Sequence, residues 1–62
     1  MNVITIRDTV TLHDLDLPEG SVLQDVEPWG ARYWRGLYCS MAGSYYEVVK
    51  REDCEVVEEE VE

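Results

Sequence analysis

Three side chains in this sequence have the chemistry of nucleophilic catalysis: Cys39, Cys54 and His13, which is the only histidine. A cysteine attacks as its thiolate, and a neighbouring base is the usual means of forming that thiolate. Neither cysteine stands at a spacing typical of a cysteine–histidine enzyme. We therefore interpret both as free, reduced thiols that pack as small hydrophobic side chains. We predict no catalytic residue and no enzymatic activity.

The segment that begins at His13 also contains side chains of the kinds that bind metals. His13, Asp14 and Asp16 are the candidate ligands. A calcium loop continues with further oxygen ligands and a central glycine, whereas Leu15 and Leu17 interrupt the pattern here. We interpret the segment as a solvated turn with local hydrogen bonds from side chains to the backbone. The four glycines are isolated, which excludes a glycine-rich phosphate loop, and we predict no metal and no cofactor.

The aromatic residues are concentrated in one part of the chain, residues 29–46, which contains no acidic residue. They are Trp29, Tyr33, Trp34, Tyr38, Tyr45 and Tyr46. Trp, Tyr and Arg are the residues most enriched at the energetic centres of protein interfaces. Two interpretations stay open: the segment forms only the core and its rim, or it also presents a contact face. For a contact face, we predict that the residues touching a protein partner are Trp29, Arg32, Tyr33, Arg35 and Tyr45.

The charge is strongly acidic and uneven. With 14 acidic and 5 basic residues the formal net charge is −9. Residues 52–62 contain acids and no base, and the acids are Glu52, Asp53, Glu55, Glu58, Glu59, Glu60 and Glu62. Such an end is either a solvated tail or a mimic of phosphates that enters a basic groove. For mimicry we predict that Glu55, Glu58, Glu59 and Glu60 contact a partner with a basic surface.

The same charge disfavours two other classes of partner. Nucleic-acid binding depends on neutralising phosphates with Lys and Arg, and an anionic membrane repels an acidic protein. The N-terminus lacks the basic head and apolar run of a secretory signal, and no apolar run is long enough to span a membrane. We therefore expect a cytoplasmic protein that binds neither nucleic acid nor membrane.

Alternating hydrophobicity predicts the elements that position these residues. The length of 62 residues corresponds to one domain, which we place at residues 1–57, followed by an acidic tail at residues 58–62. Residues 4–12 alternate with period two, and we expect the buried face to carry Ile4, Ile6, Val10 and Leu12. Asp8 falls on that apolar face, so residues 7–8 form either a bulge or a break between two short strands.

The pattern predicts further strands at residues 21–27, 32–40, 45–50 and 54–57. Residues 13–17 are interpreted as a loop, and turns are predicted at residues 18–20, 29–31 and 41–43. Pro28 cannot donate to a ladder, so we expect it to end the second strand. Residues from 51 onward fit either a helix or a one-turn segment followed by a strand. We prefer the strand, because a helix would place its acids at its own negative end.

The predicted pattern resembles the small Src-homology-3-like barrels. The resemblance rests on residues 17–23, which look like the turn into the second strand, on Trp34-Arg35-Gly36 in a middle strand, and on residues 46–57. It implies an all-β fold, a five-stranded antiparallel Src-homology-3-like barrel with at most one helical turn. The chain departs from the members that bind proline-rich peptides, because residues 13–17 contain no aromatic residue.

These observations lead to a prediction of a non-enzymatic protein-binding module. Size and acidity resemble small proteins of phages and mobile elements that bind and block host proteins. The specific prediction is therefore an inhibitor of a basic host protein that acts partly by charge mimicry of nucleic acid. The alternative is a structural or accessory β-barrel subunit of a homo-oligomer. Salt separates the two, because it weakens capture of a basic partner and leaves an apolar interface intact.

Overall fold

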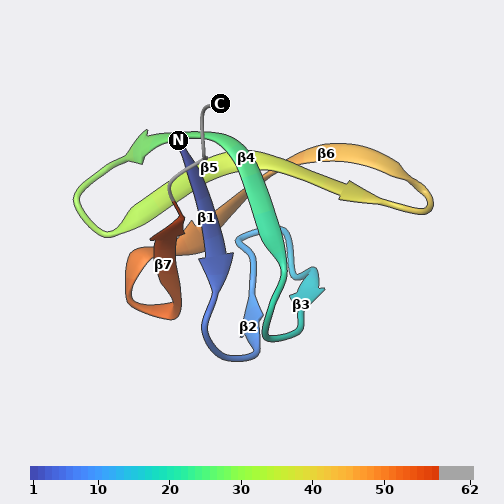
Figure 1. Ribbon diagram of the computed structural model, residues 1–62, viewed down its shortest axis with the longest axis horizontal. Coiled ribbons are helices and arrows are strands. Elements are labelled where there is room, and N and C mark those ends of the chain that lie inside the picture. The colour runs from blue at the N-terminus through green and yellow to red at the C-terminus, as the bar shows by residue number, and fades with distance from the viewer. Residues whose placement is uncertain (58–62) are drawn as a thin grey trace.

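The computed structural model describes residues 1–57 and is built almost entirely of strands (Figure 1). The main antiparallel sheet has the order β6-β5-β4-β1-β7 and comprises β1 (Asn2–Thr5), β4 (Val22–Trp29), β5 (Tyr33–Ser40), β6 (Gly43–Lys50) and β7 (Cys54–Val57). A small second sheet pairs β2 (Thr9–Val10) with β3 (Asp16–Leu17). One 3-10 turn, η1 (Arg51–Asp53), leads into β7. The all-β prediction is confirmed, as is the choice of a turn and a strand after residue 50.

The sheet has two edges, β6 and β7. Within residues 1–57 no ladder joins these two strands, so the structure shows an open five-stranded sheet and a separate two-stranded sheet rather than a closed barrel. The Src-homology-3-like barrel therefore stays a prediction, whereas the antiparallel sheet is established.

The core lies on one face of the main sheet. Its buried members are Val3, Leu17, Leu23, Val26 and Val49. Trp34 and Tyr38 project from β5 onto the same face and pack against this cluster. The register explains why, because Leu23 pairs with Tyr38 and Trp34 pairs with Val49, and directly paired residues point to the same face.

The prediction for the first apolar face is wrong, because the threonines face the interior. Ile6, Val10 and Leu12 are exposed, whereas Thr5 and Thr11 are almost fully buried. The Thr5 hydroxyl donates to the carbonyl of Pro18 and accepts from the amide of Ser21, at 2.8 and 2.9 Å. A buried hydroxyl with its hydrogen bonds satisfied carries little penalty, so the polar face of this segment can be the inner one. The break at residues 7–8 is present between β1 and β2.

Two further predictions about the strands are corrected. Residues 13–17 are not entirely a loop, because Asp16 and Leu17 form β3 and Leu17 enters the core. Pro28 does not end its strand, since β4 continues to Trp29 and Pro28 pairs with Trp34. On its other side β4 pairs with β1 at Val22 and Leu23, and the Val26 amide donates to the Met1 carbonyl. Among residues 1–57, nothing pairs with that side of β4 at Pro28, where a missing N–H is tolerated.

A bulge in β4 sets the packing of the sheet's centre. The register shifts between Gln24 and Glu27, and Asp25 adopts a positive φ of 53°. This conformation suits the short polar side chain of aspartate better than most others. The bulge places Val26 over Gly36 of β5, so closely that a Cβ on Gly36 would lie 2.5 Å from the Val26 Cγ2 atom. The close approach of Val26 therefore leaves no room for a side chain at position 36, which explains why the residue is glycine.

Asp53 ties the start of β7 to the β1–β2 region. Its carboxylate accepts from the Thr9 hydroxyl at 2.7 Å and from the Arg7 guanidinium at 2.8 Å. These two hydrogen bonds, the one from Thr9 being the larger influence, lower the pKa of the Asp53 carboxyl below its ordinary value of 3.8. The carboxylate thus joins segments that are distant in sequence.

We expect Asp53→Asn to lower the free energy of unfolding by about 1–2 kcal/mol at pH 7. Because the folded-state pKa is lowered, the charge stabilises the fold fully above about pH 4. That stabilisation is lost as the pH falls through the lower folded-state pKa. The difference between wild type and variant in urea unfolding should therefore shrink as the pH falls below about 4. Asp16→Asn serves as the control, since no hydrogen bond of its side chain is seen within residues 1–57. A pH-independent difference for Asp53→Asn would contradict the assignment.

No helix among the described residues is both long and apolar enough to cross a membrane.

Candidate protein-binding surface

The face of the sheet opposite the core carries a cluster of large side chains that are exposed or half-buried. Trp29 pairs with Tyr33, and Leu37 pairs with Tyr46, so these side chains share the face that also carries Arg35. Each comes from one of three adjacent strands, β4, β5 or β6. Alternation along β5 places Trp34 and Tyr38 on the core side and Tyr33 and Arg35 on this outer side.

Arg35 lies between two aromatic rings. Its guanidinium carbon is 5.4 Å from the centroid of Trp29 and 4.3 Å from that of Tyr46. The Glu27 carboxylate, from the residue paired with Arg35, lies 3.5 Å from the guanidinium. About half of the surface of each aromatic residue is accessible, 47% for Trp29 and 51% for Tyr46. We call Trp29, Tyr33, Arg35 and Tyr46 the Trp–Arg–Tyr face.

Three of the residues predicted from sequence, Trp29, Tyr33 and Arg35, are brought together on this face. Tyr45 is not, because it pairs with Tyr38 and so belongs to the core side of β6, near the exposed hairpin end. The sequence interpretation missed Tyr46, which takes the place expected of Tyr45. The two-residue turn after Ser40 would have identified Tyr46, since it sets the pairing of Leu37 with Tyr46.

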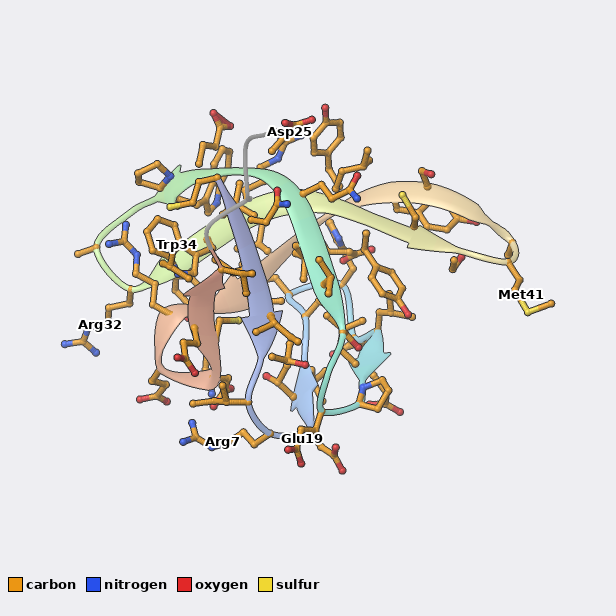
Figure 2. All side chains as sticks on the ribbon, viewed as in Figure 1. Arg7, Glu19, Asp25, Arg32, Trp34 and Met41 are labelled. Atoms are coloured by element: carbon orange, nitrogen blue, oxygen red, sulfur yellow. The ribbon has the colours of Figure 1, made fainter. Side chains whose placement is uncertain are left out.

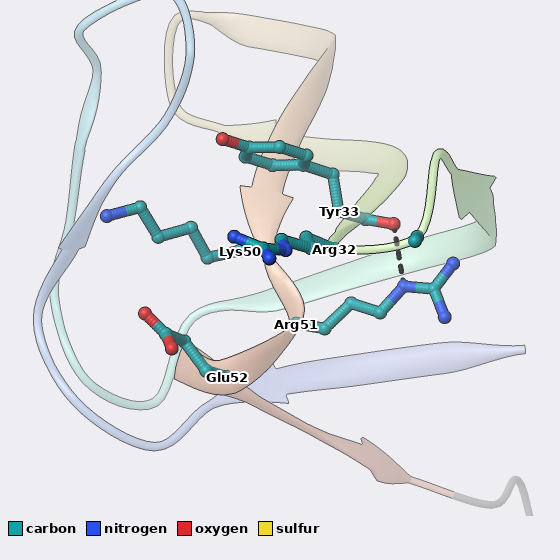
Figure 3. Close-up of a pocket in the computed structure, with 6 residues that line it drawn as sticks. Arg32, Tyr33, Lys50, Arg51 and Glu52 are labelled. Carbon is teal, nitrogen blue, oxygen red and sulfur yellow. Dashed lines mark hydrogen bonds between the residues drawn. The ribbon is translucent and has the colours of Figure 1, made fainter.

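Arg32 lines a separate open pocket of about 560 Å³ at the end of β5 and β6. Figure 3 shows that the neighbouring Lys50 and Arg51 point to opposite sides of the strand, while Tyr33 rises above them. The Arg51 guanidinium is held by hydrogen bonds within the fold, because it donates to the carbonyls of Tyr33 and Gly30 at 3.0 and 2.6 Å. The basic side chains therefore diverge, and the pocket does not focus their charge on one point.

Of the acidic residues predicted to bind a partner, the structure describes Glu55, and it lies elsewhere. Glu55 is an exposed residue of β7 and pairs with Ile4, at the opposite edge of the sheet from β6. Glu58, Glu59 and Glu60 lie outside the described residues. Strand β1 thus lies between Glu55 on β7 and β4, the nearest strand that contributes to the Trp–Arg–Tyr face.

Cys39, Cys54 and His13, the residues with nucleophilic or basic chemistry, are not part of the Trp–Arg–Tyr face. Burial, with a smaller contribution from the neighbouring Asp53 carboxylate, raises the pKa of the Cys54 thiol to about 11. A thiol with such a pKa remains protonated at neutral pH and is a poor nucleophile. Cys39 is exposed near the end of β5, and both cysteines are free. The His13 ring nitrogen Nδ1 lies 3.1 Å from the carboxylate of Glu47, which is buried.

His13 therefore pairs with the Glu47 carboxylate. Across residues 1–57 there is no group of three or more His, Cys, Asp or Glu side chains that could hold a metal ion.

Comparison with protein families, with curated proteins and with solved structures gave no match for this chain. Any account of its function therefore rests on the geometry of its own residues.

Proposed function

We propose that this protein is a non-enzymatic protein-binding module whose main contact surface is the Trp–Arg–Tyr face. The observation that carries the proposal is the position of Arg35 between Trp29 and Tyr46 on an exposed sheet surface. The main core cluster is built on the other face of the sheet. On this face the buried Val48 pairs with Arg35, while Trp29 and Tyr46 remain about half exposed. Large exposed aromatic groups beside an arginine have the composition of an interface centre.

Preorganisation supports the proposal. A free arginine side chain loses conformational freedom when it binds, at a cost of about 0.5–1.5 kcal/mol. Here the Arg35 side chain is already restrained by two rings and by Glu27, and its side chain is 34% exposed. Trp29, Arg35 and Tyr46 stand on paired strands rather than on loops, so a partner meets a surface that is already formed.

The proposed partner is a protein with a basic surface. A net charge of −9 steers such a partner toward the chain, and this attraction weakens as salt is added. Within this proposal, the acidic tail and Glu55 speed association and the Trp–Arg–Tyr face supplies the close contact. The more specific role of a mobile-element inhibitor that mimics nucleic acid is part of the same proposal and rests on the acidity of the chain.

Affinity capture from lysate tests the proposal with two neighbouring tyrosines. Tyr46 and Tyr45 have similar exposure, 51% and 47%, yet lie on opposite faces of β6. We expect wild type and Tyr45→Ala to capture the same proteins, identified by mass spectrometry. Tyr46→Ala should reduce their recovery about tenfold or more, because a hot-spot truncation costs about 2 kcal/mol or more.

Salt provides the second arm of the experiment. Recovery by wild type should fall between about 50 and 500 mM NaCl, since a basic partner is attracted partly by charge. Two results would contradict the proposal: equal capture by wild type and Tyr46→Ala, or no protein enriched over empty beads at either salt concentration. Circular dichroism of each variant shows whether the fold has been retained.

A further inference from the structure

Among residues 1–57, no strand pairs with the outer edge of the first half of β6. β6 lies at the end of the sheet order, with β5 on its other side. The amide of Leu12 donates to the carbonyl of Val48 at 3.1 Å and covers the edge at that point. From Gly43 to Tyr46, no backbone group within residues 1–57 bonds to this edge. Figure 1 shows the β5–β6 hairpin extending away from the other strands.

The bond from Leu12 shows which backbone groups point outward. In an antiparallel pair, residues alternate between bonding to the neighbouring strand and turning their N–H and C=O groups away from it. Val48 turns its carbonyl to the edge. Tyr46 and Ser44, two and four positions earlier, therefore also turn their N–H and C=O groups to the edge. The edge presents two donors and two acceptors in a row.

This edge lacks the features that normally prevent edge-to-edge pairing. Proteins protect exposed edges with charged side chains, prolines or bulges. Residues 36–46 contain neither a charged residue nor a proline, and β5 and β6 pair without a register shift. Tyr45 is about half exposed, and Met41 is fully exposed at the tip of the hairpin (Figure 2). In a chain of net charge −9, the hairpin is a neutral segment where two copies can approach without placing like charges in contact.

We infer that two copies of this chain pair through their β6 edges in an antiparallel, two-fold symmetric dimer. Ser44 of each copy stands opposite Tyr46 of the other. Each Ser44 N–H donates to the partner's Tyr46 carbonyl, and each Tyr46 N–H donates to the partner's Ser44 carbonyl. Tyr45 meets the partner's Tyr45 across the axis, as a close pair with Cβ atoms about 4.5–5.5 Å apart. The two main sheets become continuous, a form of strand addition.

The dimer leaves the proposed partner surface free. The Tyr46 backbone bonds along the edge, whereas its side chain remains on the Trp–Arg–Tyr face. Tyr45 projects from the other face of β6. The inference therefore stands on the edge geometry alone and does not depend on the proposed function.

Sedimentation equilibrium of the purified chain tests the dimer. We expect reversible dimerisation that strengthens with added salt, because screening reduces repulsion between two copies of charge −9. Ser44→Pro should weaken dimerisation about tenfold or more. It removes an outward N–H in each copy and spares the bonds to β5. Ser44→Ala keeps the N–H and should behave as wild type. The inference is overturned if the chain stays monomeric at the highest protein concentration tested. The same holds if the β6 edge pairs only with a strand of another protein.

A disulfide experiment tests the register and stays informative if Ser44→Pro fails to fold. In a Cys39→Ser, Cys54→Ser background, Tyr45→Cys places two thiols directly opposite each other across the axis. Tyr46→Cys places its thiol opposite the partner's Ser44, with the partner's own thiol about 8 Å away, beyond disulfide reach. Mild oxidation should yield a covalent dimer from Tyr45→Cys at a rate at least several times that from Tyr46→Cys. Equal rates, or no covalent dimer from Tyr45→Cys, contradict the inferred register.

Discussion

Trp34→Ala is expected to lower the free energy of unfolding by about 3–5 kcal/mol, the largest loss for any single side chain described here. Trp34 packs against the core cluster, and its ring supports the Arg51 guanidinium at 4.1 Å. Arg51 in turn holds the carbonyls of Gly30 and Tyr33. Removing the ring therefore opens a cavity and releases the residue that fastens the β4–β5 turn. Since small domains have about 5–15 kcal/mol in total, the variant should be largely unfolded at modest temperature.

Urea unfolding followed by circular dichroism measures this loss, and Trp29→Ala is the matched control. Trp29 is the more exposed tryptophan, and it lies outside the core cluster. Its replacement should cost about 1 kcal/mol or less. The account of the core is wrong if Trp29→Ala destabilises the fold as much as Trp34→Ala does.

The second large effect is expected at Gly36. A Cβ there would lie 2.5 Å from Val26 Cγ2, 3.1 Å from Leu23 Cβ and 3.2 Å from a backbone oxygen. Alanine in a strand gains about 0.5–1 kcal/mol over glycine from reduced chain entropy, but overpacking a core costs about 1–3 kcal/mol. The steric cost is the larger effect, because two of the three contacts are to a Cβ atom and a backbone atom with little freedom to move. We therefore expect Gly36→Ala to be destabilising.

A double-mutant cycle with Val26→Ala identifies the cause. Val26→Ala alone should destabilise the fold, because Val26 is a buried core residue. In the Gly36→Ala background the same change removes the clashing methyl group. The double variant should therefore lose less unfolding free energy than the sum of the two single-variant losses, and the difference should be about 0.5–3 kcal/mol. Additive losses would show that the approach of Val26 does not explain why glycine is needed.

The strands could be predicted from the sequence where alternation and turn residues agreed. The segment from Arg51 to Val57 followed from local chemistry and is confirmed. A hairpin turn also follows Ser40 as predicted, but it consists of Met41 and Ala42, because β6 already begins at Gly43. The buried face of the first strands was not predictable in this way. Thr5 and Thr11 can lie in the interior because their hydroxyls form hydrogen bonds, Thr5 with residues distant in sequence and Thr11 with a nearby one. A hydropathy pattern does not show which hydroxyls will find such partners.

The contact surface was predictable in composition and only partly in geometry. The clustering of aromatic residues with arginine pointed to the segment that carries most of the proposed Trp–Arg–Tyr face, and Trp29, Tyr33 and Arg35 do lie together on it. The choice between Tyr45 and Tyr46 depends on the register of β6 against β5, which one residue of slip would reverse. The bulge at Asp25 was likewise not predicted, because a positive φ at a non-glycine residue leaves a weak trace in sequence.

The two proposals assign different roles to adjacent tyrosines. Tyr46 contributes its ring to the Trp–Arg–Tyr face, and Tyr45 contributes its ring to the dimer axis. Tyr46→Ala should therefore impair capture of a partner and leave the dimer intact, because its backbone bonds remain. Failure of one proposal is thus separable from failure of the other.

The central claim is that the Trp–Arg–Tyr face binds a protein, and the indole N–H signals of the chain test it most directly. The protein has two tryptophans, one on each face of the sheet, so its ¹⁵N–¹H spectrum has two indole signals. They are assigned with Trp29→Phe. On titration with the captured partner, the account predicts that the Trp29 indole and the Arg35 Nε–H signals shift or broaden while the Trp34 indole signal stays in place. Unchanged Trp29 and Arg35 signals at saturating partner would contradict it.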